Sequence, residues 1–429
     1  MKKKVRVIFH VSIGYNDFDH MLPIIYSLVH SQNYHYEIDV IFDWNSVFFL
    51  KDDERYKYLI KTPRIKITDI FQNKYDFIIN YVVNLKQPNN RLFKYIHKII
   101  KFIIRKYISS MFDIEKIDWK RLYGLSAHNE KDIIVFSIGG KRIFNIIRKL
   151  KKINSKIKYI LLPHGGDLCE NSMLNIDNLS RSKEEGFDFS CWNEMDYIFI
   201  QDKRRKNKSV KNGVSLSKLK LVGSARFSKE WMEIKKLIGI DGPQVLNYEN
   251  KIKILILMPN MLSNIFYDEV MRTIQFIAQY SEVSLKVQYR AGEVRVPKDL
   301  KKNGNVDWIL SEYSTSALID WADVAIHAVT TMQFECFQKN KVVIFPRYLM
   351  ANTALCDVYS AGIILKNRDD LRETMNTMVS DFEYFRKKYT SNSHNIDRYL
   401  FDYVMAESKE PVLKNYIDSI EELIEKDLE

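Results

Sequence analysis

The sequence predicts an α/β protein with two domains, each built from parallel strands that alternate with helices. Its 429 residues are enough for two domains with separate hydrophobic cores. Short apolar runs typical of buried parallel strands recur in both halves, and segments with helical periodicity follow most of them. Residues 239–250 are rich in turn-forming side chains, as expected for a linker. We therefore expect two Rossmann-like domains at 1–240 and 251–395, followed by helices at 396–429.

Composition and charge restrict the kinds of partner. Hydrophobic residues make up 46% of the chain and charged residues 28%, so composition predicts no disordered region. The formal net charge of +12 favours partners that carry phosphate, which include nucleotides, nucleic acid and anionic membrane surfaces. The lysines are spread over the whole length, so part of this charge reflects general composition.

Neither a zinc site nor a membrane span is expected. The four cysteines lack the spacing of zinc ligands, and reduced thiols in a cytoplasmic protein are the simplest explanation for them. The apolar run at residues 5–11 is short and is interrupted by Arg6 and His10, so it is typical of a strand and not of a signal peptide. No run of about eighteen or more uncharged apolar residues occurs, which argues against a spanning helix.

The first half begins like a Rossmann-like domain. Residues 5–11 form a predicted strand, residues 12–19 a polar loop with a glycine, residues 21–30 a helix and residues 38–42 a second strand. The loop contains no Gly-x-Gly-x-x-Gly motif. A dinucleotide-binding domain of the hydride-transfer kind is therefore disfavoured.

A strand at residues 76–80 and, after it, three more strands and a basic helix are predicted before the linker. The three strands are residues 133–138, 158–162 and 196–202, and the helix is residues 141–152. Residues 203–213 (KRRKNKSVKNG) are expected to form a solvated basic loop. No interleaved aromatic residues or known recognition module accompany them, so no nucleic-acid partner is expected.

The second half is organised around a strand, a hydroxyl-bearing turn, a helix and a second strand. In order these are residues 323–326, His327 with Thr330 and Thr331, residues 332–337, and residues 342–345. This order defines a crossover unit of a parallel sheet. At the carboxyl end of its first strand, backbone N–H groups and threonine hydroxyls can donate to a phosphate, and Glu335 can accept from ribose hydroxyls. The alternative is a buried crossover whose threonines only cap the helix.

Further apolar runs complete the second α/β domain. Strands are expected at residues 253–258, 283–289, 307–310 and 361–365, with a helix at 368–389 and two more helices within 397–429. The strand at 283–289 ends at Tyr289 and Arg290. An arginine in this position can bind a phosphate through two parallel hydrogen bonds.

The segment ADVAIHAVTTMQFECFQKNKVVIFP resembles the nucleotide-binding motif of the GT-B glycosyltransferases, especially the bacterial capsule and lipopolysaccharide transferases and the polyol-phosphate transferases of teichoic-acid synthesis. Two positions depart from the pattern, since Lys341-Val342 replaces the usual Lys-Pro and Tyr289-Arg290 replaces a frequent His-Pro. The resemblance implies a GT-B fold, with a cleft between two Rossmann-like domains and C-terminal helices that pack back toward the first domain.

The same resemblance implies that the second domain binds a nucleotide-sugar donor, CMP- or UDP-linked, without a separate cofactor or metal ion. The residues expected to contact the donor are His327, Thr330, Thr331, Glu335 and Arg290. A nucleotide-sugar is a substrate of this reaction, so no resident cofactor is predicted.

The strand at 158–162 runs directly into Pro163-His164-Gly165-Gly166. Glycines at the end of a strand let the backbone approach a ligand, and a histidine can accept or donate a proton near neutral pH. This loop resembles the His-Gly loop of capsule and teichoic-acid transferases. The resemblance implies that His164 is a catalytic base or a phosphate contact, with Gly165 and Gly166 beside the donor. A turn histidine bonded to the backbone is the alternative.

Asp17, Asp19 and His20 are further candidates for the base. In GT-B enzymes the loop after the first strand faces the cleft, so a carboxylate or histidine there can deprotonate the acceptor. Asp17-Phe18-Asp19 also matches the D-x-D motif of metal-dependent GT-A transferases, but that motif normally follows several strands, so no metal role is expected. The alternative is that Asp19 only caps the helix that follows it.

Residues 91–112 (RLFKYIHKIIKFIIRKYISSMF) form a predicted basic amphipathic helix, with cations on one face and isoleucines on another. Such a helix can lie on an anionic lipid surface or meet a lipid-linked phosphate acceptor. A solvated helix packed on its own domain gives the same pattern. We expect a cytoplasmic protein, with peripheral contact at the inner face of the plasma membrane as the role of this helix.

These features predict an inverting, metal-independent glycosyltransferase of bacterial surface-glycan synthesis. Its partners would be a nucleotide-sugar donor and a glycan or lipid-linked glycan acceptor. Three alternatives stay open: a CDP-polyol phosphotransferase, a nonhydrolysing sugar-nucleotide epimerase, and a non-enzymatic basic scaffold that binds membrane or RNA. The epimerase would need several carboxylates around the sugar.

Overall fold

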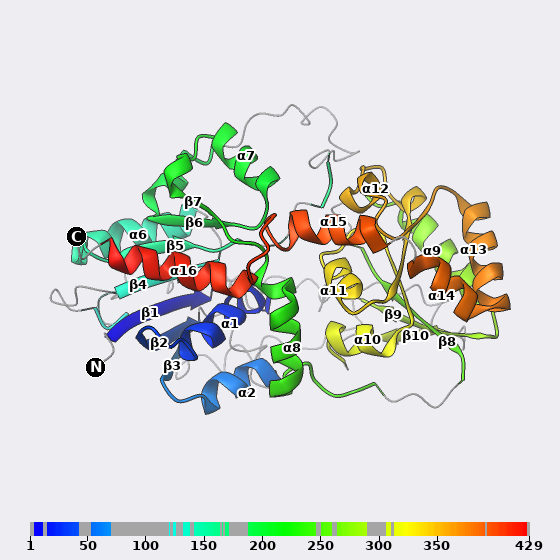
Figure 1. Cartoon of the computed structure of the whole chain (residues 1–429), viewed down its shortest axis with the longest axis horizontal. Coiled ribbons are helices and arrows are strands. Elements are labelled where there is room, and N and C mark those ends of the chain that lie inside the picture. The colour runs from blue at the N-terminus through cyan, green and yellow to red at the C-terminus, as the bar shows by residue number, and fades with distance from the viewer. Residues whose placement is uncertain are drawn as a thin grey trace, which may run out of the picture. The chain divides into compact units, whose positions relative to one another are not determined.

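The structure is a computed structural model in which the chain divides into two compact units (Figure 1). Unit 1 comprises residues 1–164, 191–198 and 421–429, and unit 2 comprises residues 165–190 and 199–420. The structure describes residues 4–11, 15–42, 53–69, 120, 123–125, 132–137, 141–163, 165, 168–170, 188–245, 250–259, 264–289, 306–309, 313–390 and 393–426. One boundary between the units therefore falls inside the His-Gly loop, between His164 and Gly165.

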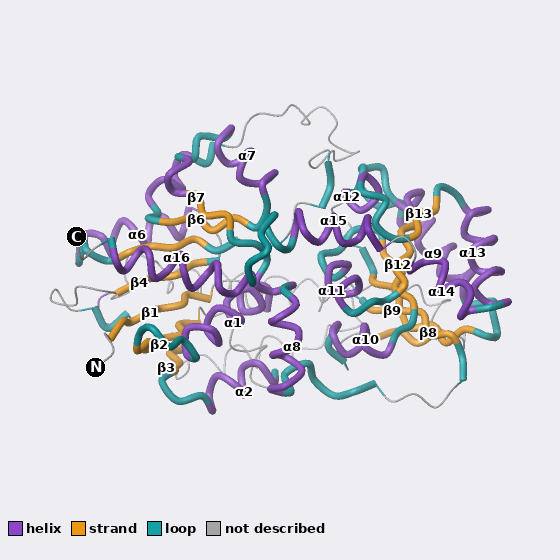
Figure 2. The backbone as a smooth tube through the Cα atoms, in the orientation of Figure 1, coloured by secondary structure: helices purple, strands orange, loops and turns teal. Residues whose placement is uncertain are grey.

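The strands of the first half form a seven-stranded sheet in the order β3-β2-β1-β4-β5-β6-β7 (Figure 2). They are β1 (Lys4–Val11), β2 (His35–Phe42), β3 (Ile65–Asp69), β4 (Asp132–Phe136), β5 (Lys158–Leu161), β6 (Tyr197–Ile200) and β7 (Leu219–Leu221). The pairs from β3 to β6 are all parallel. The carboxyl ends of β1, β4 and β5 consequently lie at one edge of the sheet. The strand predicted at residues 76–80 lies outside the described residues.

In the described part of the chain, the helices that accompany these strands are α1 (Tyr15–Val29), α2 (Glu54–Lys61), α6 (Lys141–Ile153), α7 (Lys203–Lys211) and α8 (Lys229–Ile238). Helix α1 begins at Tyr15, so the prediction of a loop as far as residue 19 is wrong. Pro23 therefore lies inside the helix, where it removes a hydrogen bond. The buried apolar face of α1 offsets this cost, since Met21, Leu22 and Ile25 are fully buried.

The expectation of a basic loop at residues 203–213 is also wrong, because residues Lys203–Lys211 form helix α7. The carboxylate of Asp202 caps the helix by accepting from the backbone N–H of Arg205 at 2.8 Å. Lysine and arginine are good helix formers, and the cap at Asp202 further favours a helix in this basic segment.

Unit 2 contains a six-stranded sheet in the order β10-β9-β8-β11-β12-β13, and all of its strand pairs are parallel. Its strands are β8 (Ile252–Leu257), β9 (Val283–Gln288), β10 (Val306–Ile309), β11 (Val324–His327), β12 (Val342–Pro346) and β13 (Ile363–Leu365). Each lies within two residues or so of a strand predicted from the sequence. Buried parallel strands are contiguous apolar runs, and this makes them easy to locate.

The core of unit 2 follows the period-two alternation of these strands. Leu255, Ala325 and Phe345 belong to one apolar cluster, whereas Ile254, Val324 and Ile344 belong to a second cluster. Successive side chains of a strand point to opposite faces, so both faces of the sheet are buried. Helices that contribute side chains to the first cluster include α10 and α11, and those that contribute to the second include α9 and α13.

The helices of unit 2 beyond α8 are α9 (Tyr267–Ile277), α10 (Thr315–Trp321), α11 (Gln333–Gln338), α12 (Leu355–Val358), α13 (Arg368–Ser380), α14 (Phe382–Thr390), α15 (Ser393–Tyr403) and most of α16 (Val412–Glu425). The predicted single helix at 368–389 is two helices, because the backbone of Asp381 is extended (φ −155°, ψ 94°). In the part of the chain that is described, no helix is long and apolar enough to cross a membrane.

Helix α16 ends in unit 1, where Glu421 is anchored by polar groups at the start of β2. Its carboxylate accepts from Nδ2 of Asn33 at 2.7 Å and from the hydroxyl of Tyr36 at 3.3 Å. Burial and the charge of Glu421 raise the pKa of the Tyr36 hydroxyl far above its ordinary value, so it stays protonated and donates.

Gly223, between β7 and the short helix η5 (Ala225–Phe227), allows a close approach of two segments of unit 2. Its φ is +87°, and a Cβ placed there would lie 2.5 Å from the carbonyl oxygen of Val404. The backbone N–H of Ser224 donates to the same carbonyl at 2.8 Å. Only glycine satisfies both the left-handed backbone and the short approach.

Candidate functional site

The turn between β11 and α11 lies at the carboxyl edge of the six-stranded sheet, and β11 is an interior strand between β8 and β12. The hydroxyl oxygen of Thr330 accepts from the N–H of Met332 at 3.3 Å. The carbonyls of Thr330 and Thr331 accept from the N–H groups of Gln333 and Phe334 at 3.3 and 3.2 Å. Because the Thr330 hydroxyl serves the turn as an acceptor, its proton can still be donated to a ligand.

His327, the last residue of β11, is 2% exposed and its ring lies 5.9 Å from that of Phe345. Neither ring nitrogen makes a hydrogen bond of ordinary geometry with another described residue. Burial disfavours the charged imidazolium and lowers the pKa of His327 to about 4, and the backbone of Ala328 offsets only part of this effect. The ring is therefore neutral near pH 7, with one nitrogen that donates and one that accepts.

Gln333 and Tyr289 are two further polar residues at this edge that the sequence patterns did not single out as ligands. Within the described part of the chain, Oε1 of Gln333 and the hydroxyl of Tyr289 are buried and have no hydrogen-bond partner. The Tyr289 ring stacks on Trp308 with a centroid distance of 5.3 Å. An unpaired buried polar atom costs about 1–3 kcal/mol, so these groups call for a partner such as water or a ligand.

Glu335 is buried in a network of ion pairs that joins α8, α10 and α11. Its Oε1 lies 3.4 Å from Nζ of Lys235 and 3.0 Å from Nζ of Lys339, and these lysines also pair with Asp241 at 3.1 Å and Asp320 at 2.9 Å. Burial alone would raise the pKa of Glu335, but the two ammonium groups outweigh it and lower the pKa to about 2. The carboxylate is thus ionised and already holds two cations. Ribose binding by Glu335 stays a prediction.

Arg226 of η5 reaches the same turn, although no role for it was expected from the sequence. Its Nη2 lies 3.5 Å from Sδ of Met332, and its guanidinium carbon lies 5.0 Å from the centroid of the Phe227 ring. Burial lowers the pKa of Arg226 to about 10, and the charge of Glu335 opposes this shift. Arg226 therefore remains charged and adds a cation beside Met332.

The segment after the His-Gly loop pairs with the segment that follows β12. Cys169 forms an antiparallel bridge with Ala354, and the N–H of Glu170 donates to the carbonyl of Thr353 at 2.9 Å. Nη2 of Arg204 donates to the carbonyls of Cys169 and Glu170 at 2.9 and 2.6 Å. The structure therefore brings the chain just beyond Gly165 to the carboxyl edge of the six-stranded sheet.

Three residues of the predicted site, the candidate base His164 and the predicted donor contacts Gly166 and Arg290, lie outside the described residues. Gly165 is described and has a φ of +63°, and no atom of another described residue lies within 4 Å of the position of a Cβ. Residues 91–112 also lie outside the described part of the chain. The roles assigned to these positions stay predictions.

In unit 1 the predicted bases lie on helix α1. Asp17 and His20 are buried, whereas Asp19 is partly buried and forms an ion pair with Arg55 of α2. Because α1 begins at Tyr15, the alternative that Asp19 caps this helix is wrong. Its carboxylate instead links α1 to α2.

His10 is a polar residue on β1 that the sequence marks only as an interruption of an apolar run. Its side chain is buried, and Nδ1 lies 2.6 Å from the hydroxyl of Tyr123. Arg6, two pleats earlier on the same face of β1, donates to the Tyr123 carbonyl at 2.7 Å. The two side chains hold the segment around Tyr123 against the central strand.

Across the described residues, no group of three or more His, Cys, Asp or Glu side chains is placed to hold a metal ion. The structure shows no disulfide bond among the described cysteines, which are Cys169, Cys191, Cys336 and Cys356. Burial raises the pKa of Cys336 and Cys356 well above the ordinary value, which keeps these thiols protonated and unreactive.

No protein-family model and no curated protein matches the sequence. The fold, however, is that of known GT-B proteins. The UDP-GlcNAc 2-epimerase of Neisseria meningitidis bound to UDP-GlcNAc aligns with a TM-score of 0.51 and 13% identity over 98% of this chain and 100% of that one. MnaA of S. aureus with UDP gives 0.53 and 13%, over 99% and 97%. HepE of Anabaena with UDP and glucose gives 0.51 and 11%, over 98% and 99%.

These similarities define the class of fold: the chain has the two-sheet α/β architecture of the GT-B superfamily, as expected from the sequence. The neighbours include nucleotide-sugar-binding enzymes. At identities of 11–13% the likeness concerns the fold. Activity and substrate therefore have to be argued from the site.

Proposed function

We propose that the protein is a glycosyltransferase that moves a sugar from a nucleotide-activated donor to a glycan or lipid-linked glycan acceptor in bacterial surface-glycan synthesis. The main support is the turn of Thr330 and Thr331 at the carboxyl edge of a parallel sheet in a GT-B fold. Ligands of open α/β sheets bind at this edge. The buried ring of His327 and Oε1 of Gln333 add to this support, because among the described residues neither has a hydrogen-bond partner of ordinary geometry.

In this proposal the turn binds the donor phosphates. Negative charge accumulates on the phosphate as the glycosidic bond breaks, so the hydroxyl donors of Thr330 and Thr331 stabilise the transition state more than the ground state. The neutral ring of His327 and the amide of Gln333 are suited to hydroxyl or phosphate oxygens of the donor. Arg226 supplies a nearby positive charge.

The acceptor hydroxyl needs a base, for which His164 is our first candidate. An imidazole has the proton affinity for this step near neutral pH, and inversion requires one base and no covalent intermediate. Asp17 and Asp19 are the other candidates. The carboxylate of Asp19 is engaged in an ion pair with Arg55, and Asp17 is buried, where an acceptor hydroxyl does not reach it.

Two enzyme alternatives fit the same fold. A CDP-polyol phosphotransferase would use the same threonine turn, and a UDP-GlcNAc 2-epimerase is the activity in the names of several structural neighbours. Contact of residues 91–112 with an anionic membrane belongs to the proposal as well.

A panel of nucleotide donors tests these alternatives directly. The full-length protein is heated with CMP-, CDP-, UDP- or GDP-linked donors, and an enzyme of this class is stabilised by one nucleotide only. With the stabilising donor, nucleotide release that requires an added acceptor supports the transferase. Epimerisation without an acceptor supports the epimerase, and stabilisation by none of the donors contradicts both.

A further inference from the structure

Two cationic residues directly follow the ends of two neighbouring strands at the carboxyl edge of the six-stranded sheet. Strand β12 ends at Pro346 and β13 ends at Leu365, and these two residues are paired in register. Arg347 and Lys366 follow them directly in the chain. Because neighbouring strands are about 4.8 Å apart, the register places the backbones at the ends of β12 and β13 next to each other.

Arg347 and Lys366 line a pocket of about 350 Å³ in unit 2. Phe266 contributes an aromatic ring to the wall, while Asn352 and Thr353 contribute polar groups. None of the described residues that line this pocket is acidic. Because two positive charges line this pocket, an anion that enters it is attracted to both of them.

Arg347 and Lys366 form few ion pairs with the other described residues. The ammonium of Lys366 forms no ion pair with another described residue, and Asp370 instead accepts from the Lys366 backbone N–H at 2.7 Å. Nε of Arg347 lies 3.3 Å from Oδ2 of Asp357. A guanidinium has five N–H donors, so this contact leaves most of them for a ligand.

The wall of the pocket is held in place by contacts with two other segments. Oδ1 of the buried Asn352 accepts from Nδ2 of Asn264 at 3.1 Å. The carbonyl of Thr353 accepts from Glu170, just beyond the His-Gly loop, at 2.9 Å. These hydrogen bonds fix the wall of the pocket, which lowers the entropic cost of binding.

We propose that this pocket is an anion subsite that binds a phosphate group through Arg347 and Lys366. Strand β12 is the neighbour of β11, so the subsite and the turn of Thr330 and Thr331 open at the same edge of one sheet. In a transferase the phosphate belongs either to the donor diphosphate or to a lipid-linked acceptor. This choice of ligand rests on the proposed function, whereas the subsite itself does not.

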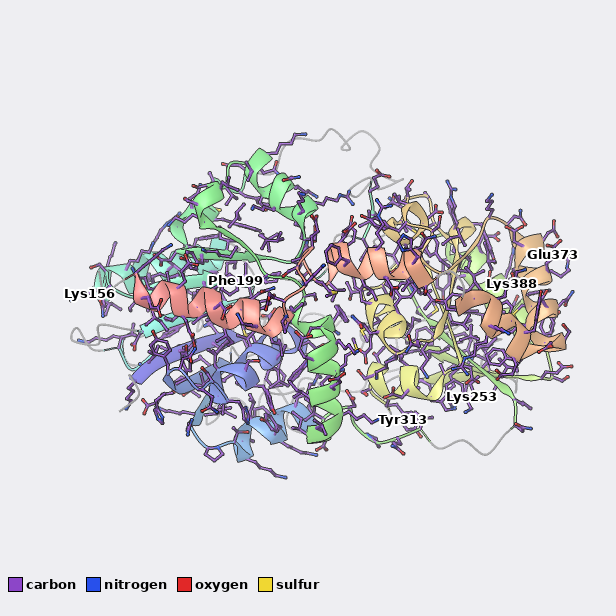
Figure 3. The ribbon with its side chains drawn as sticks, in the orientation of Figure 1. Lys156, Phe199, Lys253, Tyr313, Glu373 and Lys388 are labelled. Carbon is purple, nitrogen blue, oxygen red and sulfur yellow. The ribbon has the colours of Figure 1, made fainter. Side chains whose placement is uncertain are left out.

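The test is a calorimetric titration of the full-length protein with inorganic pyrophosphate at constant ionic strength. The variant Arg347→Gln/Lys366→Gln removes both charges of the pocket. The matched control, Arg372→Gln/Lys388→Gln, removes the same charges from exposed positions on α13 and α14; Lys388 is marked in Figure 3. Thr331→Val is titrated in parallel, so that binding at the threonine turn is separated from binding in the pocket.

We expect pyrophosphate affinity to fall at least tenfold in Arg347→Gln/Lys366→Gln and to change less than twofold in the control. The subsite is contradicted if the wild type and the pocket variant bind pyrophosphate equally well. It is also contradicted if the control variant loses as much pyrophosphate affinity as the pocket variant. A competing titration with UDP identifies the source: displacement assigns the pocket to the donor, and simultaneous binding assigns it to an acceptor phosphate. A third outcome separates the two proposals. If no nucleotide binds to the wild type but pyrophosphate affinity still falls in Arg347→Gln/Lys366→Gln, the proposed function is contradicted and the subsite is supported.

Discussion

The ammonium group of Lys235 on α8 lies 3.4 Å from Oε1 of Glu335 on α11, although the two residues are 100 positions apart in the chain. Both side chains are largely buried, so neither charge is well solvated. Buried ion pairs cost desolvation energy, but loss of one partner leaves the other charge uncompensated. The pair consequently ties the helix that follows Thr331 to α8 and gives the network a measurable role in stability.

Glu335→Gln should lower the free energy of unfolding by about 3 kcal/mol, because Lys235 and Lys339 lose their shared counter-charge in a buried site. Urea unfolding monitored by circular dichroism measures the change. The control Glu373→Gln removes an exposed carboxylate from α13 and should change stability by less than about 0.5 kcal/mol. Equal effects of the two substitutions would show that the network contributes nothing.

The stability of the protein should fall between pH 6.5 and 4 because of His327. Its folded pKa of about 4 lies below the ordinary value of 6.5, so the unfolded chain binds more protons in this range. The stabilisation is complete above pH 6.5 and is lost as the pH falls toward 4, by an amount on the order of 3 kcal/mol.

His327→Gln removes this titration and should flatten the pH dependence of the urea midpoint between pH 6.5 and 4. His394→Gln, at an exposed position on α15, is the control and should keep the slope of the wild type. The same slope in His327→Gln as in the wild type would argue against a buried neutral imidazole.

Thr331→Val should weaken binding of the stabilising nucleotide by about 1–2 kcal/mol, since a hydroxyl donor to phosphate is replaced by a methyl group of similar size. Calorimetry measures the affinity. Thr377→Val, on the exposed side of α13, should bind the nucleotide like the wild type. An unchanged affinity in Thr331→Val would move the phosphate away from this turn.

His164→Ala should abolish turnover and leave nucleotide affinity nearly intact, because a base acts on the acceptor and not on the donor nucleotide. Initial rates with the stabilising donor and direct nucleotide binding are measured together. His394→Ala serves as the control, with wild-type rates expected. Full turnover in His164→Ala would show that another residue is the base, and Asp17 and Asp19 would then be the remaining candidates.

Gly223→Ala should destabilise the protein more than Gly239→Ala. Both glycines have positive φ, +87° and +68°, so both substitutions carry a backbone cost of about 1–2 kcal/mol. Only at Gly223 would the new Cβ meet another atom, the Val404 carbonyl oxygen at 2.5 Å, whereas nothing lies within 4 Å at Gly239. A smaller or equal loss of thermal stability at Gly223 would contradict the close approach.

The strands were the most predictable part of the fold. Strands β5 and β12 coincide with the predicted runs at 158–162 and 342–345 almost residue for residue, because a strand buried on both faces is a contiguous apolar segment. Helix limits were harder to predict. Helix α1 begins before its expected start because tertiary packing of its apolar face outweighs Pro23, and α7 forms because of a single cap at Asp202.

Local sequence patterns were sufficient to locate one part of the candidate site, the Thr330–Thr331 turn. The strand, the turn and the helix that form it are contiguous in the chain. The partners of Glu335, the burial of His327, and the pocket of Arg347 and Lys366 were not accessible in this way. These features join segments that are distant in sequence. Their contacts depend on strand order and packing, which no local periodicity encodes.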